Sequence, residues 1–209
     1  MLQELTHIVA RVQFLRRREE YEQALFEIDR VFKQFWDVDA TRPLSLDELI
    51  SACSQEEESV AEKMVSLADL LKEQGDLLAL QKKSAESQHS YALSLGLYLE
   101  TLRTSVVSMN LIQKAEHLIE QTSDLPLPAE VLKRLLSYYE ARGLLAKAED
   151  VLFDWLETGD AAAPEGGLAF YDRQAAKSDE ELERGDLPRD EVEAGRKEVN
   201  KRLEAEDSD

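Results

Sequence analysis

Few side chains in this sequence have the types and the spacing that catalysis or metal binding requires. The three histidines, His7, His89 and His117, are far apart, and the His-Glu-x-x-His pattern of zinc enzymes does not occur. The glycine-rich patterns that hold phosphates do not occur either. Cys53 is the single cysteine, which excludes an intrachain disulfide and a zinc site built from cysteines. We therefore predict that the protein is not an enzyme and expect no catalytic residue, no cofactor and no metal.

Two segments imitate metal sites, and each also has a structural explanation. Residues 37–48 carry acids at the first and third positions and a glutamate at the twelfth, as calcium loops do, but Arg42 stands where such loops need a glycine. Glu86 and His89 form one Glu-x-x-His pair, whereas a di-metal helical bundle needs two. We expect a structural loop in the first case and a solvated charged helix face in the second. Cys53 has no base near it in sequence, so we expect a small, half-buried thiol.

The charge balance limits the partners. The 209 residues include 44 acids and 25 bases, for a net charge of −19. Nucleic acids and anionic membranes both attract basic surfaces, so we expect neither as a partner. Residues 1–11 lack the features of a signal peptide, and no apolar run approaches the roughly 20 residues that span a membrane. We predict a cytoplasmic protein.

Apolar residues recur at helical spacing along most of the chain. With only 8 glycines and 5 prolines, the sequence offers few turns for an all-β fold. A Ser45–Glu48 capping box opens one short helix. Longer helices are predicted over 1–17, 21–35, 59–81, 85–103, 106–121, 129–142 and 144–157. The fold class is therefore all-α, built from antiparallel helical hairpins.

The C-terminal quarter differs from the rest in composition. Gly159–Gly167 is rich in glycine and alanine and contains a proline, so we predict a linker there. This divides the chain into a helical domain, 1–158, and an acidic tail, 159–209. Two further helices are expected at 168–178 and 188–203, with a second capping box at Ser178 between them. We expect the tail helices to cap the helical domain or to pack on a second copy.

An internal repeat connects two of the predicted hairpins. The segment from Gly143 to Leu152 aligns with the segment from Asn110 to Ile119, and both contain Lys-Ala-Glu followed by an aliphatic pair. Glycine and asparagine tolerate the positive φ of a tight turn, so we expect both to be turn residues. This pattern resembles the tetratricopeptide repeat (TPR), a 34-residue helical hairpin. Gly143 and Glu19 then share the turn position of the repeat. The resemblance implies a short TPR-like right-handed solenoid over 1–158 with C-terminal capping helices.

The tail has a resemblance of its own. Three tail sequences, Leu-Ala-Phe-Tyr-Asp-Arg from Leu168, Ser-Asp-Glu-Glu-Leu from Ser178 and Leu-Pro-Arg-Asp-Glu-Val from Leu187, look like the end of an uncharacterised bacterial family. That family has helical hairpins before its tail and no assigned function. The resemblance implies a bacterial cytoplasmic protein and supplies no catalytic residues.

A TPR-like solenoid implies a protein-interaction module. Its concave surface is lined by set positions of each first helix. These positions include here Val9, Gln13, Arg16, Arg17, Asp69, Lys72, Asp76, Lys133, Ser137 and Glu140. Their mixed charge suits a protein or peptide partner. Two alternatives remain: a self-associating structural or regulatory protein, such as a homodimer, and an enzyme whose metal is held by clustered carboxylates.

Overall fold

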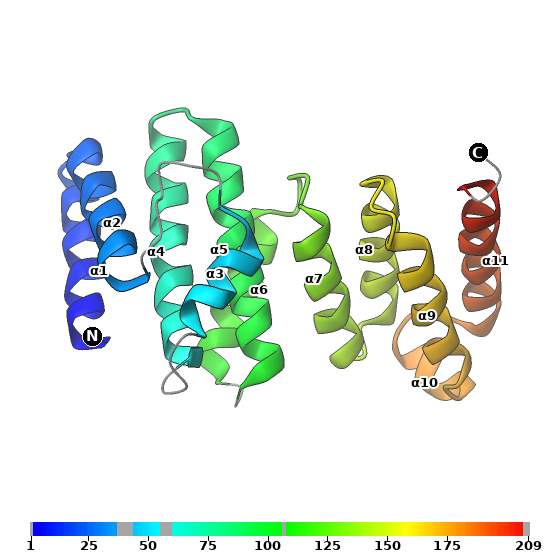
Figure 1. The fold of residues 1–209 in the computed structure, drawn as a ribbon. Helices are drawn as coiled ribbons and strands as arrows, with labels where there is room; N and C mark the ends of the chain where they lie inside the picture. The colour runs from blue at the N-terminus through cyan, green and yellow to red at the C-terminus, as the bar shows by residue number, and fades with distance from the viewer. Residues whose placement is uncertain (1, 37–43, 55–59, 106–107, 207–209) are drawn as a thin grey trace. The chain divides into compact units, whose positions relative to one another are not determined.

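The computed structural model describes residues 2–36, 44–54, 60–105 and 108–206, and these residues form eleven helices and no strand (Figure 1). The all-α class is therefore confirmed. The helices are α1 (Leu2–Arg17), α2 (Tyr21–Trp36), α3 (Leu46–Cys53), α4 (Val60–Leu80), α5 (Ser84–Thr104), α6 (Met109–Gln121), α7 (Ala129–Ala141), α8 (Leu145–Glu157), α9 (Ala163–Ala175), α10 (Asp179–Arg184) and α11 (Arg189–Glu206). Among these residues no helix is both long and apolar enough to cross a membrane.

Both predicted capping boxes are confirmed. The Ser45 hydroxyl accepts a hydrogen bond from the Glu48 N–H, and the Glu48 carboxylate accepts one from the Ser45 N–H. Ser178 and Glu181 make the same reciprocal pair at α10. These bonds satisfy N–H groups that a helix start leaves without intrahelical partners.

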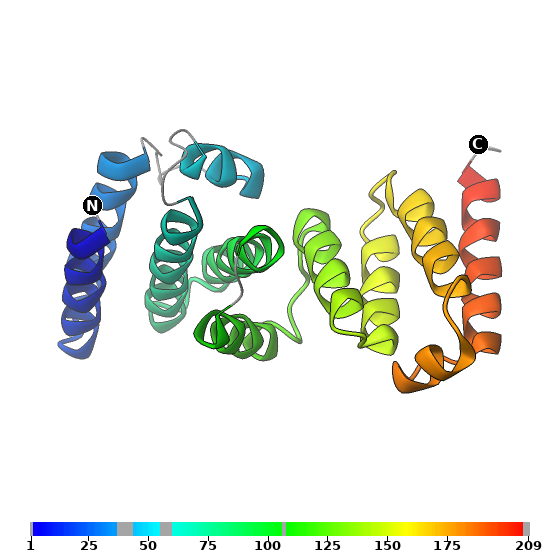
Figure 2. The ribbon, with the colours of Figure 1, turned by 90° about the horizontal axis from the view of Figure 1, so that it is seen from below.

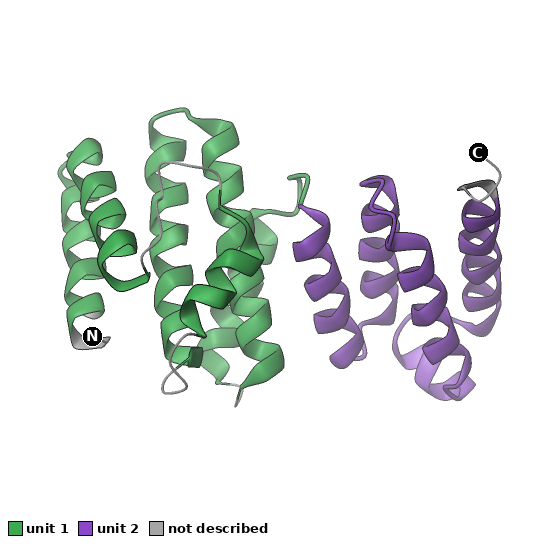
Figure 3. Ribbon diagram, in the orientation of Figure 1, with its two compact units in different colours: residues 1–127 green, residues 128–209 purple. Residues whose placement is uncertain are grey.

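The helices group into two compact units, residues 1–127 and 128–209 (Figure 3). This division differs from the predicted one, because the α7–α8 hairpin belongs with the tail helices. The predicted linker Gly159–Gly167 is mostly helix. Pro164 lies in the first turn of α9, where a missing N–H costs nothing. Gly167 lies inside α9, where a Cβ would come within 3.2 Å of Leu152 on α8. Glycine and proline here serve helix start and close packing, not flexibility.

Unit 1 is organised around α5. Every residue from 90 to 101 is buried, covered by α3, α4 and α6 (Figure 2). A helix buried on all sides must satisfy its polar side chains internally. The Ser94 hydroxyl donates to the Ala68 carbonyl at 2.7 Å, and the Ser87 hydroxyl donates to the Gly75 carbonyl at 2.8 Å. Helices α1 and α2 form a hairpin that packs on α4.

Unit 2 is built from the α7–α8 hairpin and the tail helices. Helix α9 packs between α8 and α11, and α10 contacts α11. Phe170 and Tyr171 of α9 are completely buried. The tail helices therefore pack on their own chain, on the hairpin that precedes them.

Four helix–helix turns share one backbone geometry. Glu19, Lys82, Gly143 and Asp186 each have φ between 57° and 71°, the left-handed region. At each turn the next N–H donates to the carbonyl five residues before it, as in a Schellman motif. The predicted turn roles of Glu19 and Gly143 are confirmed.

The turn predicted at Asn110 is wrong. Asn110 lies inside α6, and the Ser108 hydroxyl caps that helix by accepting from the Leu111 N–H. An effective N-cap starts the helix before the expected turn.

Replacing Lys82 by glycine is expected to stabilise the protein by about 1 kcal/mol, because a side chain in the left-handed region is strained and glycine is not. Gly143→Ala is the converse change. A Cβ there meets nothing within 4 Å, so its cost of about 1 kcal/mol would come from the backbone alone. Urea denaturation measures both free energies of unfolding. Equal stability of Lys82→Gly and the wild type would contradict the prediction.

Candidate functional site

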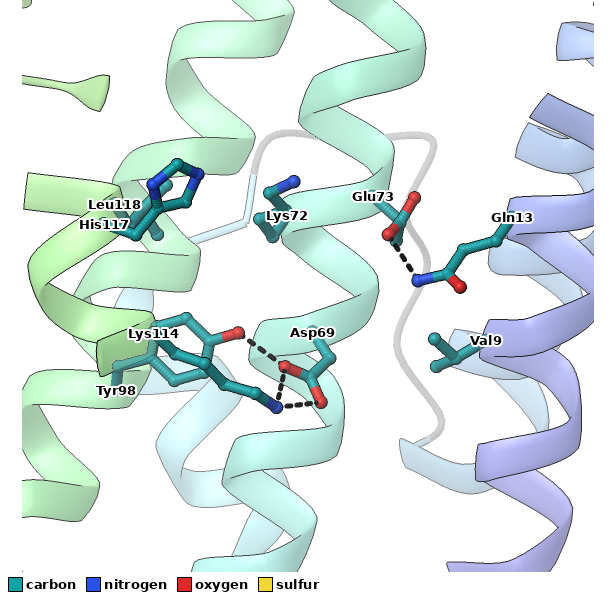
Figure 4. Close-up of a pocket in the computed structure, with 9 residues that line it drawn as sticks. All are labelled: Val9, Gln13, Asp69, Lys72, Glu73, Tyr98, Lys114, His117 and Leu118. Atoms are coloured by element: carbon teal, nitrogen blue, oxygen red, sulfur yellow. Dashed lines mark hydrogen bonds and ion pairs between the residues drawn. The ribbon is translucent and has the colours of Figure 1, made fainter. Parts of the chain in front are cut away.

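A groove of about 340 Å³ lies within unit 1, between α1, α4, α5 and α6 (Figure 4). Its lining consists of charged and polar side chains with a few aliphatic ones. The lining residues are Val9, Gln13, Asp69, Lys72, Glu73, Tyr98, Lys114, His117 and Leu118. Residues of four helices, up to 109 positions apart in sequence, thus supply one surface.

One wall of the groove is a three-helix hydrogen-bonded cluster. The Tyr98 hydroxyl on α5 donates to Asp69 Oδ1 on α4 at 2.6 Å (Figure 4). Lys114 Nζ on α6 contacts both oxygens of the same carboxylate, at 2.7 and 2.8 Å. Burial, and next the Asp69 charge, raise the pKa of Tyr98 well above its usual range. The hydroxyl therefore remains a donor at every physiological pH.

The opposite wall joins α4 to α1. Gln13 Nε2 donates to Glu73 Oε1 at 2.9 Å, and Arg16 forms an ion pair with Glu73 Oε2 at 2.9 Å. Arg16 also bonds to Asp76, which accepts a further bond from Lys72 Nζ at 2.7 Å. Glu73 is only 5% exposed, so its charge requires its two partners, Gln13 and Arg16.

The two walls are tied to α5 by equivalent bonds. The Tyr91 hydroxyl donates to Asp76 Oδ1 at 2.9 Å, one heptad before the Tyr98–Asp69 bond on α5. Burial and the Asp76 charge raise the pKa of Tyr91 to about 12. Two tyrosines seven residues apart face two aspartates seven residues apart, because seven residues make almost two helical turns.

The lysines that line the groove keep spare hydrogen-bond donors, and Glu73 Oε2, which is in an ion pair with Arg16, accepts no hydrogen bond from the described residues. The Asp69 carboxylate accepts from a tyrosine and a lysine, and the Glu73 carboxylate is held by Gln13 and Arg16. An ammonium group has three N–H donors, and the ion pairs of Lys72 and Lys114 each engage one carboxylate. The groove is therefore suited to groups that accept hydrogen bonds, such as carboxylates and peptide carbonyls.

The structure brings together most of the interaction residues predicted in unit 1. Gln13, Asp69 and Lys72 line the groove, and Arg16 and Asp76 bond to its lining. Arg17 is exposed and does not line the groove.

The residues predicted in unit 2 have contacts within their own unit. Lys133 pairs with Asp160 at 2.6 Å, and Glu140 accepts bonds from Arg173 and Gln174 of α9. Ser137 is exposed, and its hydroxyl donates to the Lys133 carbonyl. Lys133 and Glu140 were predicted to contact a partner. They bind instead residues that follow α8 in the same chain.

Five lining residues were not among the predicted interaction residues: Glu73, Tyr98, Lys114, His117 and Leu118. The prediction considered only the first helix of each hairpin, whereas α5 and α6 also face the groove. The heptad spacing shared by the tyrosines and aspartates was the available signal. His117 is exposed at the groove.

Other candidate chemical groups lie away from the groove. Cys53 is fully buried rather than half-buried, and burial raises the pKa of its thiol to about 11. A protonated, inaccessible thiol is a poor nucleophile. Among the described residues no three His, Cys, Asp or Glu side chains gather in a group that could hold a metal. Positions 37–43 of the calcium-like segment lie outside the described residues.

The chain belongs to a family of unknown function, DUF6483, whose family model matches residues 1–204. The tail resemblance noted above had suggested membership of a family without assigned function. Comparisons with curated proteins and with solved structures found no match.

Tyr98→Phe is expected to lower the free energy of unfolding by about 1–2 kcal/mol, because it removes a partly buried hydrogen bond to a charged acceptor. Tyr21→Phe is the control. The Tyr21 hydroxyl forms no hydrogen bond with a described residue, so we expect a change under about 0.5 kcal/mol. Urea denaturation compares the two. Equal losses in both variants would show that the Tyr98–Asp69 bond contributes nothing specific.

Asp160 gives a pH-dependent prediction in unit 2. Bonds from Lys133, the Trp155 indole N–H and the Ala162 N–H lower the pKa of this carboxyl to about 2, from its ordinary 3.8. A lowered folded-state pKa stabilises the fold above the ordinary value, and this contribution is lost as the pH falls through about 2. Asp160→Asn is expected to cost about 1 kcal/mol at pH 7, after allowance for solvent screening, and clearly less near pH 2, where the wild-type carboxyl is half protonated.

Melting curves of the wild type and the variant between pH 7 and pH 2 measure this difference. The exposed Asp150, which forms no ion pair with a described residue, provides the control variant Asp150→Asn. A difference between wild type and Asp160→Asn that stays constant down to pH 2 would contradict the assignment.

Proposed function

We propose that this protein is a non-catalytic interaction protein whose unit 1 binds a segment of another protein in the groove between α1, α4, α5 and α6. The observation that supports this most directly is the groove itself, a concave surface with charged side chains in its lining, supplied by four helices. Four residues chosen from the sequence for partner contact line it: Val9, Gln13, Asp69 and Lys72. Its carboxylates are engaged internally and its lysines retain donors, which favours a polypeptide over a metal ion.

The chemistry of the groove also defines the kind of segment. Lys72, Lys114 and His117 present N–H groups, and Val9 and Leu118 add apolar side chains. A complementary segment carries acidic side chains or free backbone carbonyls together with an aliphatic residue. An acidic segment gains from the charge-assisted hydrogen bonds that lysines make to carboxylates.

A TPR-like arrangement of the hairpins is part of the same proposal. Its support is the common turn geometry at Glu19, Lys82 and Gly143, and the complete burial of Ala115 and Ala148 in the two Lys-Ala-Glu motifs. Small residues at these places let helices approach closely. The bacterial cytoplasmic setting rests on the tail resemblance and on the composition of the chain.

Filling the groove tests the proposal. His117→Trp places a bulky ring on the exposed edge of the groove, and His89→Trp makes the same change at an exposed position that does not line it. Full-length wild type and both variants are used as bait in cell lysate, and captured proteins are quantified by mass spectrometry. We expect capture of a specific partner by wild type and His89→Trp, and a reduction of about tenfold or more with His117→Trp.

Two outcomes would contradict the proposal. Capture of the same partner by all three baits would place the binding surface elsewhere. Failure of the wild type to capture any other protein would remove the interaction function, while matching melting curves confirm that the variants are folded.

A further inference from the structure

The outer face of the α1–α2 hairpin exposes two phenylalanines. Phe14 is 56% exposed and Phe26 is 66% exposed, whereas side chains of this size are usually buried. Both helices pack on α4 (Figures 1 and 2). Buried residues of α2, such as Ala24 and Ile28, are two positions from Phe26, so Phe26 points away from the hairpin core.

The two rings lie at the same level of the hairpin. Arg11 Nε pairs with Glu27 Oε1 at 2.9 Å, which sets the register of the antiparallel helices. In this register the position opposite Phe14 is Ala24, only two residues, or about 3 Å along the axis, from Phe26. The Arg18 guanidinium lies 5.5 Å from the centre of the Phe14 ring. The hairpin therefore exposes an aromatic ring on each helix at nearly the same level, with the Arg18 charge beside Phe14.

The charges beside Phe26 form a self-complementary row. Glu22, Phe26 and Arg30 are spaced at i, i+4 and i+8, so they form one ridge on the surface of α2. The row reads acid, aromatic, base. Rotation of a second copy by 180° about an axis through Phe26 reverses the row, which places each Glu22 opposite the other copy's Arg30. Ridges of i±4 residues on two helices interlock in the commonest class of helix packing.

Both charged groups keep hydrogen-bonding capacity for this contact. Glu22 Oε1 accepts one bond from Gln81, which leaves its other lone pairs. Arg30 bonds to Glu27 through Nε and one terminal nitrogen, and its side chain remains 52% exposed. Its other terminal nitrogen is not used in these bonds.

We propose that this outer face joins two copies of the chain into a two-fold dimer, with Phe26 at the axis and reciprocal Glu22–Arg30 pairs beside it. The acid and base in one row favour a second copy over an unrelated acidic or basic partner. Contact of the Phe26 rings removes the most exposed aromatic surface of the hairpin from water. Val9 and Gln13 line the groove on another side of α1, so dimerisation leaves the groove open.

Sedimentation of full-length protein between about 1 and 100 µM tests the dimer. We expect a concentration-dependent monomer–dimer equilibrium, and an increase of about tenfold or more in the dissociation constant with Phe26→Ser. Leu80→Ser is the control, because Leu80 is also exposed, at 53%, but lies on α4. A wild type that is monomeric throughout would overturn the proposal, as would a dimer that Phe26→Ser leaves unchanged.

Charge exchange tests the two-fold arrangement. Glu22→Arg makes the row basic at both ends and Arg30→Glu makes it acidic, so each variant alone is expected to be monomeric. A mixture of the two variants is expected to form heterodimers, and a chain with both changes is expected to dimerise like the wild type. Failure of both the mixture and the double variant to associate, when melting curves show that every variant is folded, would overturn the reciprocal pairing.

Discussion

The structure of unit 1 depends on two partly buried hydrogen bonds from tyrosines of α5 to aspartates of α4. Tyr91 donates to Asp76 and Tyr98 donates to Asp69. A carboxylate at a buried helix interface needs more than one partner. Asp76 recruits Arg16 from α1, and Asp69 recruits Lys114 from α6. The bonds that hold α5 to α4 therefore also position the two neighbouring helices, and with them the walls of the groove.

The complete burial of α5 explains why this polar network exists. A helix covered on every side by apolar residues alone could rotate or slide against its neighbours at little cost. Hydroxyl groups at fixed positions remove that freedom, because an unpaired buried hydroxyl is costly. Ser87 and Ser94 bond to carbonyls of α4, and the two tyrosines add directional bonds at the rim. Apolar burial supplies the driving force for packing, and the hydroxyls define its register.

The helices could be predicted from sequence because their apolar spacing is local, and the turn roles of Glu19 and Gly143 followed from their register. The groove could be predicted only in part. Lys114 and Asp69 are 45 residues apart, and no local pattern pairs them. The sequence predicted a linker at Gly159–Gly167, but α9 begins within this segment. The prediction failed because glycine serves close packing as well as flexibility. Glu140 was assigned to a partner, whereas Arg173 of α9 binds it.

Helix α1 connects the two proposed binding surfaces of unit 1. Gln13 and Arg16 face α4 and the groove, while Phe14 and Arg18 lie on the outer side. Adjacent residues of a helix point about 100° apart, so one short amphipathic segment can serve two surfaces. A dimer through the outer side would present two grooves to one partner. If that partner carries two suitable segments, the second binding event becomes intramolecular, and the complex forms more tightly than a single groove allows. Self-association would then strengthen partner binding without changing any contact in the groove.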